Sequence, residues 1–154
     1  EILRCLVGSE MCIRDSDNAA FSGQILLVED NELNMEIAIE FFGICGASVE
    51  KAWNGSEAVE LVKARPDGYY ASIFMDIQMP IMDGYEATRQ IRQLEQQQGR
   101  KHTPIVAMSA NAFNEDVSKA YLAGMDEYIT KPVSLQEIKR VLQSLEEKKR
   151  QTEA

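Results

Sequence analysis

The stretch IFMDIQMP, residues 73–80, decides the fold, because an apolar run ends there in a carboxylate, Asp76, and a polar loop that contains a proline. The run ILLV, which precedes Glu29 and Asp30, ends in the same way, and so does the run YIT before Lys131. In an open parallel sheet the carboxyl ends of the strands meet at one crevice. The sequence therefore predicts a single pocket that is formed by three acids and one lysine.

Strand-like and helix-like periods alternate along the chain from Gln24 onward, which is the pattern of an α/β domain with a parallel sheet. The strand-like runs are almost continuously apolar, as in a sheet with helices on both faces. We therefore expect one doubly wound domain of five strands and five helices. The expected strands are 24–28, 47–53, 70–75, 104–108 and 128–130; the expected helices are 32–44, Ser56 to near Pro66, Gly84 to a polar loop at 96–100, a helix that ends at Gly124, and one that begins after Ser134.

Apolar spacing predicts the buried face of the helices. For the first helix the expected inward residues are Leu33, Ile37, Ala38 and Phe41; for the fourth they are Val117, Ala120 and Tyr121; for the last they are Leu135, Ile138, Val141, Leu142 and Leu145. Gly46 is expected to end the first helix in the left-handed conformation. Ser134 and Glu137 have the spacing of a capping box.

Charge and composition exclude several classes of function. The chain has 154 residues and a net charge of −9 with a pI of about 4.7, which disfavours binding to nucleic acid or to an anionic membrane. No apolar stretch approaches the roughly 20 residues of a membrane helix. Cys5, Cys12 and Cys45 are an odd number without CxxC spacing, which favours the reducing cytoplasm and no cysteine metal site. His102 is interpreted as an exposed loop residue and not as a catalytic base.

The first residues have neither a helical nor an alternating period. The decapeptide LVGSEMCIRD, residues 6–15, resembles a translated sequencing adapter, so we interpret 1–16 as an artefact and 17–23 as the remnant of a linker within a disordered leader. An ordinary leader or part of a targeting segment is the alternative. The domain is expected at 24–147 with a flexible tail at 148–154. The natural protein is expected to continue upstream, where a membrane anchor could lie.

The predicted group of acids with a lysine has the chemistry of a phosphoacceptor site. Glu29, Asp30 and Asp76 would repel one another without a cation, and hard carboxylate oxygens without a histidine or cysteine nearby select Mg²⁺. A carboxylate beside Mg²⁺ and the ammonium group of Lys131 can attack phosphorus and form an aspartyl phosphate. Ser109, at the end of the fourth expected strand, could donate its hydroxyl to that phosphate.

Four ordered motifs resemble the receiver domain of response regulators in two-component signalling. They are ILLVEDN (25–31), MDIQMPIMDG (75–84), MSA (108–110) and Lys131-Pro132, and the resemblance spans residues 24–145. It implies a flavodoxin-like fold, that is, a doubly wound five-stranded parallel sheet with strand order 2-1-3-4-5 and five helices.

The resemblance also implies roles for individual residues. Asp76 is the implied phosphoacceptor, and Lys131 the implied ligand of a phosphoryl oxygen. Asp30 is implied to bind Mg²⁺ directly and Glu29 mostly through water, with the backbone carbonyl of Gln78 completing the protein's share of the coordination.

Two further residues are implied to respond to the phosphate: Ser109 by swinging toward it and Tyr128 by rotating inward. Simple packing is the alternative interpretation of both side chains. Gln78 and Asn111 occupy positions that tune the lifetime of the phosphate in this family. Glu29 departs from the commoner aspartate, a change that such receivers tolerate.

Three other functions compete with this interpretation. A phosphatase of the haloacid-dehalogenase type also uses an aspartyl nucleophile, but it needs a second carboxylate two residues later, where this chain has Gln78. A dinucleotide-binding protein needs the motif GxGxxG after its first strand, and this chain lacks that motif there. A receiver that serves only as an unphosphorylated interaction module would lack the acceptor or the lysine, and this chain has both.

The amino-acid sequence of the motifs is most similar to that of receivers at the carboxyl end of hybrid sensor histidine kinases. Such a receiver accepts a phosphoryl group from a phosphohistidine and passes it on, so a histidine kinase domain and a histidine phosphotransfer domain are the expected partners. It catalyses only its own phosphorylation, and any kinase activity would lie in an upstream domain. A stand-alone single-domain response regulator is the alternative, and this segment is expected to contact neither nucleic acid nor a membrane.

Overall fold

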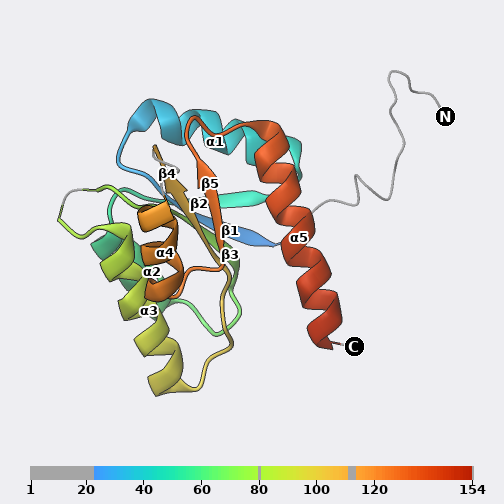
Figure 1. Ribbon diagram of the computed structural model, residues 1–154. Helices are drawn as coiled ribbons and strands as arrows, with labels where there is room; N and C mark the ends of the chain where they lie inside the picture. The colour runs from blue at the N-terminus through green and yellow to red at the C-terminus, as the bar shows by residue number, and fades with distance from the viewer. Residues whose placement is uncertain (1–22, 80, 111–113, 154) are drawn as a thin grey trace.

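The computed structural model describes residues 23–79, 81–110 and 114–153. Asn111 and all of the predicted leader (1–23) except its last residue therefore lie outside the described residues. Within this part of the chain, five strands alternate with five helices, as predicted (Figure 1). In chain order the elements are β1 (Gln24–Val28), α1 (Glu32–Ile44), β2 (Ser48–Ala52), α2 (Gly55–Ala64), β3 (Tyr70–Asp76), α3 (Gly84–Gln98), β4 (Ile105–Ser109), α4 (Asn114–Ala123), β5 (Glu127–Thr130) and α5 (Leu135–Glu153).

The strands form one parallel sheet in the order β2-β1-β3-β4-β5, which confirms the order implied by the resemblance. β1 pairs with β2 on one side and β3 on the other, so Val28 lies opposite both Ala52 and Met75. β3 also pairs with β4, where Asp76 lies opposite Met108, and β4 pairs with β5. Because all strands are parallel, their carboxyl ends meet along one edge of the sheet.

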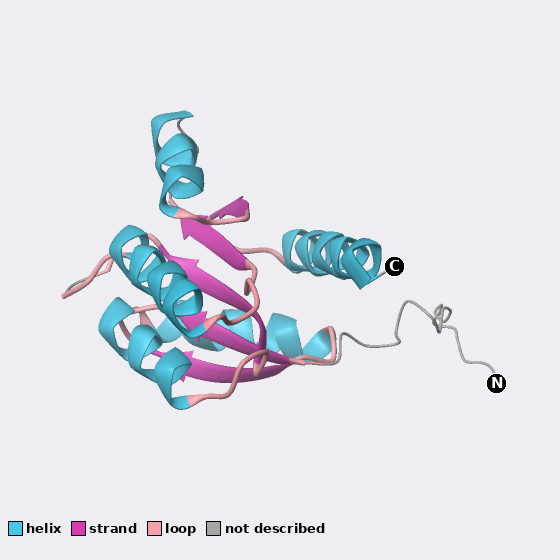
Figure 2. Cartoon of the chain, turned by 90° about the horizontal axis from the view of Figure 1, so that it is seen from below, coloured by secondary structure: helices cyan, strands magenta, loops and turns pink. Residues whose placement is uncertain are grey.

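Helices cover both faces of the sheet (Figure 2). Each layer encloses its own apolar cluster. One cluster lies under α2, α3 and α4, and the other lies under α1 and α5. In β1, Leu26 and Val28 belong to the first cluster, whereas Ile25 and Leu27 belong to the second. Successive side chains of a strand point to opposite faces. Burial of both faces therefore explains the continuous apolar sequence of the central strands.

The buried face of α1 differs from the predicted one. Ala38 is buried, as predicted, but the other two buried residues are Met35 and Phe42. Leu33 is instead 64% exposed and Ile37 is 40% exposed. Residues three and four apart share a helix face, and both sets have such spacings, so spacing alone does not choose between the faces. The fit to the sheet selects the buried face, because the ring of Phe42 packs edge-on against the ring of Phe74 with the centroids 4.8 Å apart.

The prediction for one aromatic residue of α4 was also wrong. Tyr121 was predicted to face the core, but about half of it is exposed, while Ala120 and Ala123 are buried. The helix thus packs on the sheet through small side chains.

Local capping chemistry sets the ends of several elements. The Asn54-Gly55 pair, which the sequence indicates as a turn, begins α2, and the Asn54 side chain accepts a hydrogen bond from the backbone N–H of Glu57. Ser134 Oγ accepts a hydrogen bond of 3.2 Å from the backbone N–H of Glu137, as expected for the predicted cap of α5. Gly46 has a φ of 83°, the left-handed conformation predicted after α1.

Two helices are longer than predicted. α3 continues through Gln98, into the range predicted as a polar loop, and Gly99 ends it with a φ of 64°. α5 continues to Glu153, beyond the predicted boundary at residue 147 and through most of the predicted tail. Glutamine, glutamate, lysine and arginine are good helix formers, so a polar composition does not by itself end a helix.

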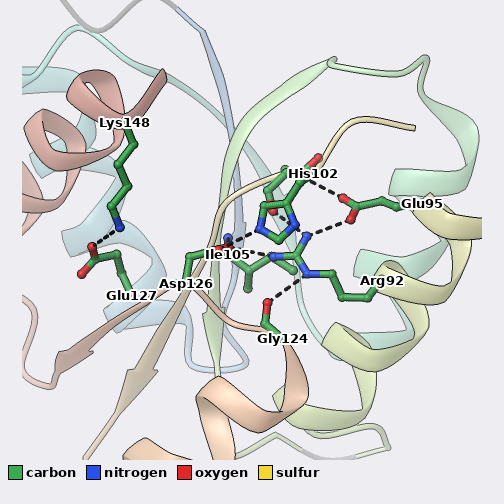
Figure 3. A network of polar contacts seen from close by, with 9 residues as sticks. Arg92, Glu95, His102, Ile105, Gly124, Asp126, Glu127 and Lys148 are labelled. Carbon is green, nitrogen blue, oxygen red and sulfur yellow. Dashed lines mark hydrogen bonds and ion pairs between the residues drawn. The ribbon is translucent and has the colours of Figure 1, made fainter. Parts of the chain in front are cut away.

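A polar network joins α3, the start of β4 and the α4–β5 turn at the edge of the sheet opposite Asp76 (Figure 3). The guanidinium group of Arg92 donates to the carbonyls of Gly124 (2.9 Å) and Thr103 (2.8 Å) and to the carboxylates of Asp126 (2.8 Å) and Glu95 (2.9 Å). His102 is exposed, as predicted, and its Nε2 lies 2.7 Å from Asp126 Oδ1. The network therefore has a structural role that is remote from the predicted acceptor.

Candidate functional site

Two neighbouring strands bring the three predicted acids together. Asp76 is the last residue of β3, and Glu29 and Asp30 directly follow β1, with which β3 pairs. One carboxylate oxygen from each residue lies within 4.8 Å of the others. Glu29 and Asp76 are each 3% exposed, whereas Asp30 is exposed to solvent. The group is thus a partly buried concentration of negative charge that opens to solvent on the side of Asp30.

Lys131 reaches the same point from the end of β5. Its backbone N–H donates a 2.7 Å hydrogen bond to the carbonyl of Ser109, which extends the pairing of β4 with β5. Its ammonium nitrogen lies 2.8 Å from Asp76 Oδ2 and 2.8 Å from Glu29 Oε1. One largely buried cation therefore bridges two buried carboxylates. Loss of one partner from a buried ion pair is costly, because the remaining charge is left without compensation.

The site has an excess of negative charge. If all three acids are ionised, three negative charges face the one positive charge of Lys131, and two negative charges remain. Burial raises the pKa of Glu29, the hydrogen bond from Lys131 lowers it, and the charge of Asp76 raises it, so that the pKa is about 7. Burial lowers the pKa of Lys131, but the hydrogen bonds to Asp76 and Glu29 outweigh this effect and raise the pKa above its ordinary value.

We predict that Glu29→Gln stabilises the metal-free protein at pH 8 and changes its stability little at pH 4. The folded state holds the Glu29 proton up to a pKa of about 7, against an ordinary 4.5, so the stability of the native protein falls as the pH rises through this window. The neutral glutamine removes that loss, which amounts to about 3 kcal/mol at pH 8. Urea unfolding of both proteins at several pH values, in the presence of a chelator, measures the difference.

The matched control for this prediction is Glu60→Gln. Glu60 is an exposed residue of α2 that pairs with Lys63 at 3.7 Å, and exposed pairs contribute little to stability. A pH profile of Glu29→Gln that runs parallel to that of the wild type would contradict the raised pKa.

The loop after β3 holds the carboxylate of Asp76 and its backbone. The backbone N–H of Gln78 donates to Asp76 Oδ1 at 3.1 Å, and the N–H of Gly84 donates to the carbonyl of Ile77 at 2.9 Å. A Cβ atom on Gly84 would lie 2.4 Å from the carbonyl oxygen of Asp76. Only glycine therefore allows α3 to begin so close to the predicted acceptor. The side chain of Asp83 caps this helix by accepting from the N–H of Glu86 at 2.9 Å.

A cavity of about 520 Å³ opens beside the acid group. Its lining residues are Asp30, Ile77, Gln78, Met79, Asp83, Tyr85, Ser109, Asp116 and Lys119. Ser109 is buried at the end of β4, so its position next to the cavity fits the predicted contact with a phosphate. Tyr128 is half-buried and packs against the cluster under α2, α3 and α4. Three predicted site residues, Asp30, Gln78 and Ser109, therefore line the same cavity.

Sequence reasoning did not place the α4 side of this cavity. The hydroxyl of Tyr85 donates to the backbone carbonyl of Asp116 at 3.3 Å, which joins α3 to the first turns of α4. Lys119 lines the cavity from the same helix. No local motif marks these residues, because their proximity to the acids depends on how α4 packs against α3.

The donor set fits a hard divalent cation. Glu29, Asp30 and Asp76 offer carboxylate oxygens, which suit Mg²⁺, and the group contains neither a histidine nor a cysteine. Lys131 leaves two negative charges uncompensated, and a divalent cation would balance them. The residues present are therefore suited to Mg²⁺.

Comparison with known proteins identifies the family. The sequence model of the response regulator receiver domain matches residues 25–143. The chain belongs to the response regulator receiver family. This receiver is 35% identical over 129 residues to hybrid signal transduction histidine kinase L from Dictyostelium discoideum, a match that covers 84% of the chain and 8% of that relative. The receiver therefore spans only a small part of the curated relatives that it matches.

Solved structures share the fold of this receiver. The co-crystal structure of the Saccharomyces cerevisiae histidine phosphotransfer signalling protein Ypd1 and the receiver domain of its downstream response regulator Ssk1 contains a match with a TM-score of 0.73 and 37% identity, covering 79% of this chain and 86% of that chain. The receiver domain of sensor histidine kinase PA1611 from Pseudomonas aeruginosa PAO1, with a magnesium ion coordinated in its active site cleft, matches with a TM-score of 0.70 and 36% identity, covering 80% and 98%. In the described part of this receiver, no helix combines the length and the apolar composition of a membrane span.

Proposed function

We propose that this receiver accepts a phosphoryl group from a phosphohistidine onto Asp76 in a Mg²⁺-dependent reaction. The observation that carries the proposal is the position of Lys131, whose ammonium group lies 2.8 Å from Asp76 and 2.8 Å from Glu29, two of the three clustered carboxylates. A lysine in this place fixes one oxygen of Asp76 and supplies positive charge where the oxygens of a phosphoryl group would arrive.

The chemistry follows from the contacts of Asp76. The N–H of Gln78 holds Oδ1 and the ammonium group of Lys131 holds Oδ2, so the carboxylate has a fixed orientation. An oxygen of Asp76 forms the new bond to phosphorus as the bond between phosphorus and the histidine nitrogen breaks, and the electron pair leaves with the imidazole. Lys131 has three donor protons and can bind a phosphoryl oxygen as its contact to Asp76 is replaced.

Glu29, Asp30 and Asp76, with the backbone carbonyl of Gln78, would hold Mg²⁺, with Glu29 contacting it mostly through water. A bound Mg²⁺ would neutralise negative charge on the transferred phosphoryl group. Ser109 lines the cavity and would donate its hydroxyl to the phosphate, and Tyr128 would rotate inward in response. These movements would change the surface that the domain presents to a partner.

The place of the domain is proposed from its relatives. We propose that it is the carboxyl-terminal receiver of a cytoplasmic signalling segment in a hybrid histidine kinase, with a histidine kinase domain and a histidine phosphotransfer domain as partners. Its match to hybrid signal transduction histidine kinase L supports the first part. The match to a receiver that was crystallised with a histidine phosphotransfer protein supports the second.

Incubation with acetyl phosphate and Mg²⁺ tests the reaction. We expect one phosphoryl group per chain, attached to the peptide that contains Asp76 through an acyl phosphate, which is stable in acid and labile in base. A chelator should lower the rate by about tenfold or more, and addition of a histidine phosphotransfer domain should remove the label. No label at saturating donor and Mg²⁺, or an acid-labile label on His102, the one histidine of the chain, would contradict the proposal.

A further inference from the structure

The start of α2 lies directly against the loop that follows β3. A Cβ atom on Gly55, the first residue of α2, would lie 2.6 Å from the carbonyl oxygen of Met82 and 3.1 Å from the Cβ atom of Ala87. Contacts below 3.0 Å to a backbone atom cannot be relieved by turning a side chain. The absence of a side chain at Gly55 therefore sets how closely the two segments approach.

The α2 side of this contact is firmly held. The side chain of Asn54 accepts from the backbone N–H of Glu57 at 2.9 Å, and the carboxylate of Glu57 accepts from the N–H of Trp53 at 3.0 Å. These two bonds form a reciprocal cap around Gly55. Gly55 itself is buried. A displacement at this contact would therefore move the loop residue Met82 rather than the helix.

The loop side carries a restrained backbone. Ile81 has a φ of 71° although its side chain is β-branched and 83% exposed. Such a residue is unfavourable in the left-handed region and persists only where its surroundings impose that conformation. Because little of the Ile81 side chain is covered, the restraint must act through the backbone of its neighbours, and Met82 is the neighbour that Gly55 contacts.

Two steps join this contact to the acceptor. Met82 is followed by Asp83 and then by Gly84, whose missing Cβ lets it lie against the carbonyl of Asp76. The N–H of Gly84 also donates to the carbonyl of Ile77 at 2.9 Å, and the next residue, Gln78, donates to Asp76 Oδ1. A shift of Met82 is therefore transmitted to the backbone of Asp76 and to Gln78 through short contacts.

We propose that Gly55 is a positioning residue for phosphoryl transfer: its bare Cα holds the loop after β3, and with it Asp76 and the carbonyl of Gln78, in the geometry that binds Mg²⁺. The proposal rests on the proposed function above. Gly55 contacts neither the phosphoryl group nor the cation, so it acts only through Met82 and Gly84. Changes of residues that support a metal's ligands commonly weaken metal binding 10- to 100-fold.

The test compares Gly55→Ala with Gly43→Ala. Gly43 is an exposed glycine of α1, and a Cβ atom there would meet nothing within 4 Å. In Gly55→Ala we expect the amide resonance of Gln78 to shift in metal-free protein and the dissociation constant of Mg²⁺ to rise by about tenfold, with labelling largely restored at saturating Mg²⁺. Gly43→Ala should keep the Gln78 resonance and bind Mg²⁺ within about twofold of wild type, because outer-shell effects need contact.

The outcomes separate the possible failures. A folded Gly55→Ala protein that binds Mg²⁺ as tightly as Gly43→Ala overturns the proposal. If Gly55→Ala shows no cooperative thermal unfolding, the wild type decides: the Gly55 amide resonance must shift during a Mg²⁺ titration while that of Gly43 does not, and an unmoved Gly55 resonance overturns the proposal. Wild-type protein that binds no Mg²⁺ overturns the proposed function itself, and this inference with it.

Discussion

Asp76→Asn is expected to lower phosphoryl incorporation from acetyl phosphate by about a hundredfold or more while leaving the protein folded. A neutral amide is a poor nucleophile toward phosphorus, whereas an ionised carboxylate forms acyl phosphates. Asparagine has nearly the same shape as aspartate. In the wild type, the N–H of Gln78 lies 3.1 Å from Asp76 Oδ1 and the ammonium nitrogen of Lys131 lies 2.8 Å from Oδ2. The one oxygen of asparagine can still accept a hydrogen bond from either donor. Labelling with radioactive donor, together with circular dichroism, separates loss of chemistry from loss of fold.

The pH-dependent stability of the Asp76→Asn variant provides a second test of the site. The negative charge of Asp76 contributes to the raised pKa of Glu29, so its removal should lower that pKa. The metal-free variant should therefore be at least as stable as the wild type at pH 8. Asp67→Asn is the matched control: Asp67 lies at the amino end of β3 and accepts a 3.0 Å hydrogen bond from the N–H of Lys101, so labelling should be unchanged. Undiminished labelling of Asp76→Asn would remove the acceptor assignment.

The convergence of the acids with Lys131 could be predicted because it depends on strand ends alone. Each residue lies at or just after the end of a strand-like run, and the parallel order of β1, β3, β4 and β5 places those ends along one edge. The sequence contains this information in a local form, as a run followed by a charge. It does not contain the bridge itself, since the approach of Lys131 to both Glu29 and Asp76 depends on the path of the chain after β5.

Packing between distant elements was the part that could not be predicted. The buried face of α1 was predicted only in part: Ala38 is buried, but Leu33 and Ile37 are exposed. Two apolar faces of the helix have compatible spacings, and the face that packs on the sheet is the one whose Phe42 contacts Phe74. The same holds for Gly55 and Gly84: a glycine in a turn is usually explained by its own backbone, whereas these two are required by a carbonyl oxygen from another segment. Such a requirement is invisible until the neighbouring segment is placed.

Lys131→Ala is expected to destabilise the metal-free protein by about 3 kcal/mol at pH 8, because it leaves two buried carboxylates without their shared cation. The cost should be smaller at pH 5 than at pH 8, because Lys131 lowers the pKa of Glu29 and its removal lets Glu29 take up a proton more readily in the folded state. The cost should also shrink when Mg²⁺ supplies the missing positive charge. Phosphoryl incorporation should fall even at saturating Mg²⁺, since Lys131 holds Oδ2 of Asp76. Thermal unfolding at pH 5 and 8, with and without Mg²⁺, measures the stability.

Lys148→Ala controls for loss of a lysine in general. Lys148 pairs with Glu127 at 3.1 Å and its side chain is 57% exposed, so its removal should cost less than about 1 kcal/mol and should not depend on Mg²⁺. A Lys131→Ala protein that is equally stable at pH 8 with and without Mg²⁺ would contradict the charge balance of the site. The lysine compensates one of the three negative charges, and the two that remain match the charge of the divalent cation that we propose for this site.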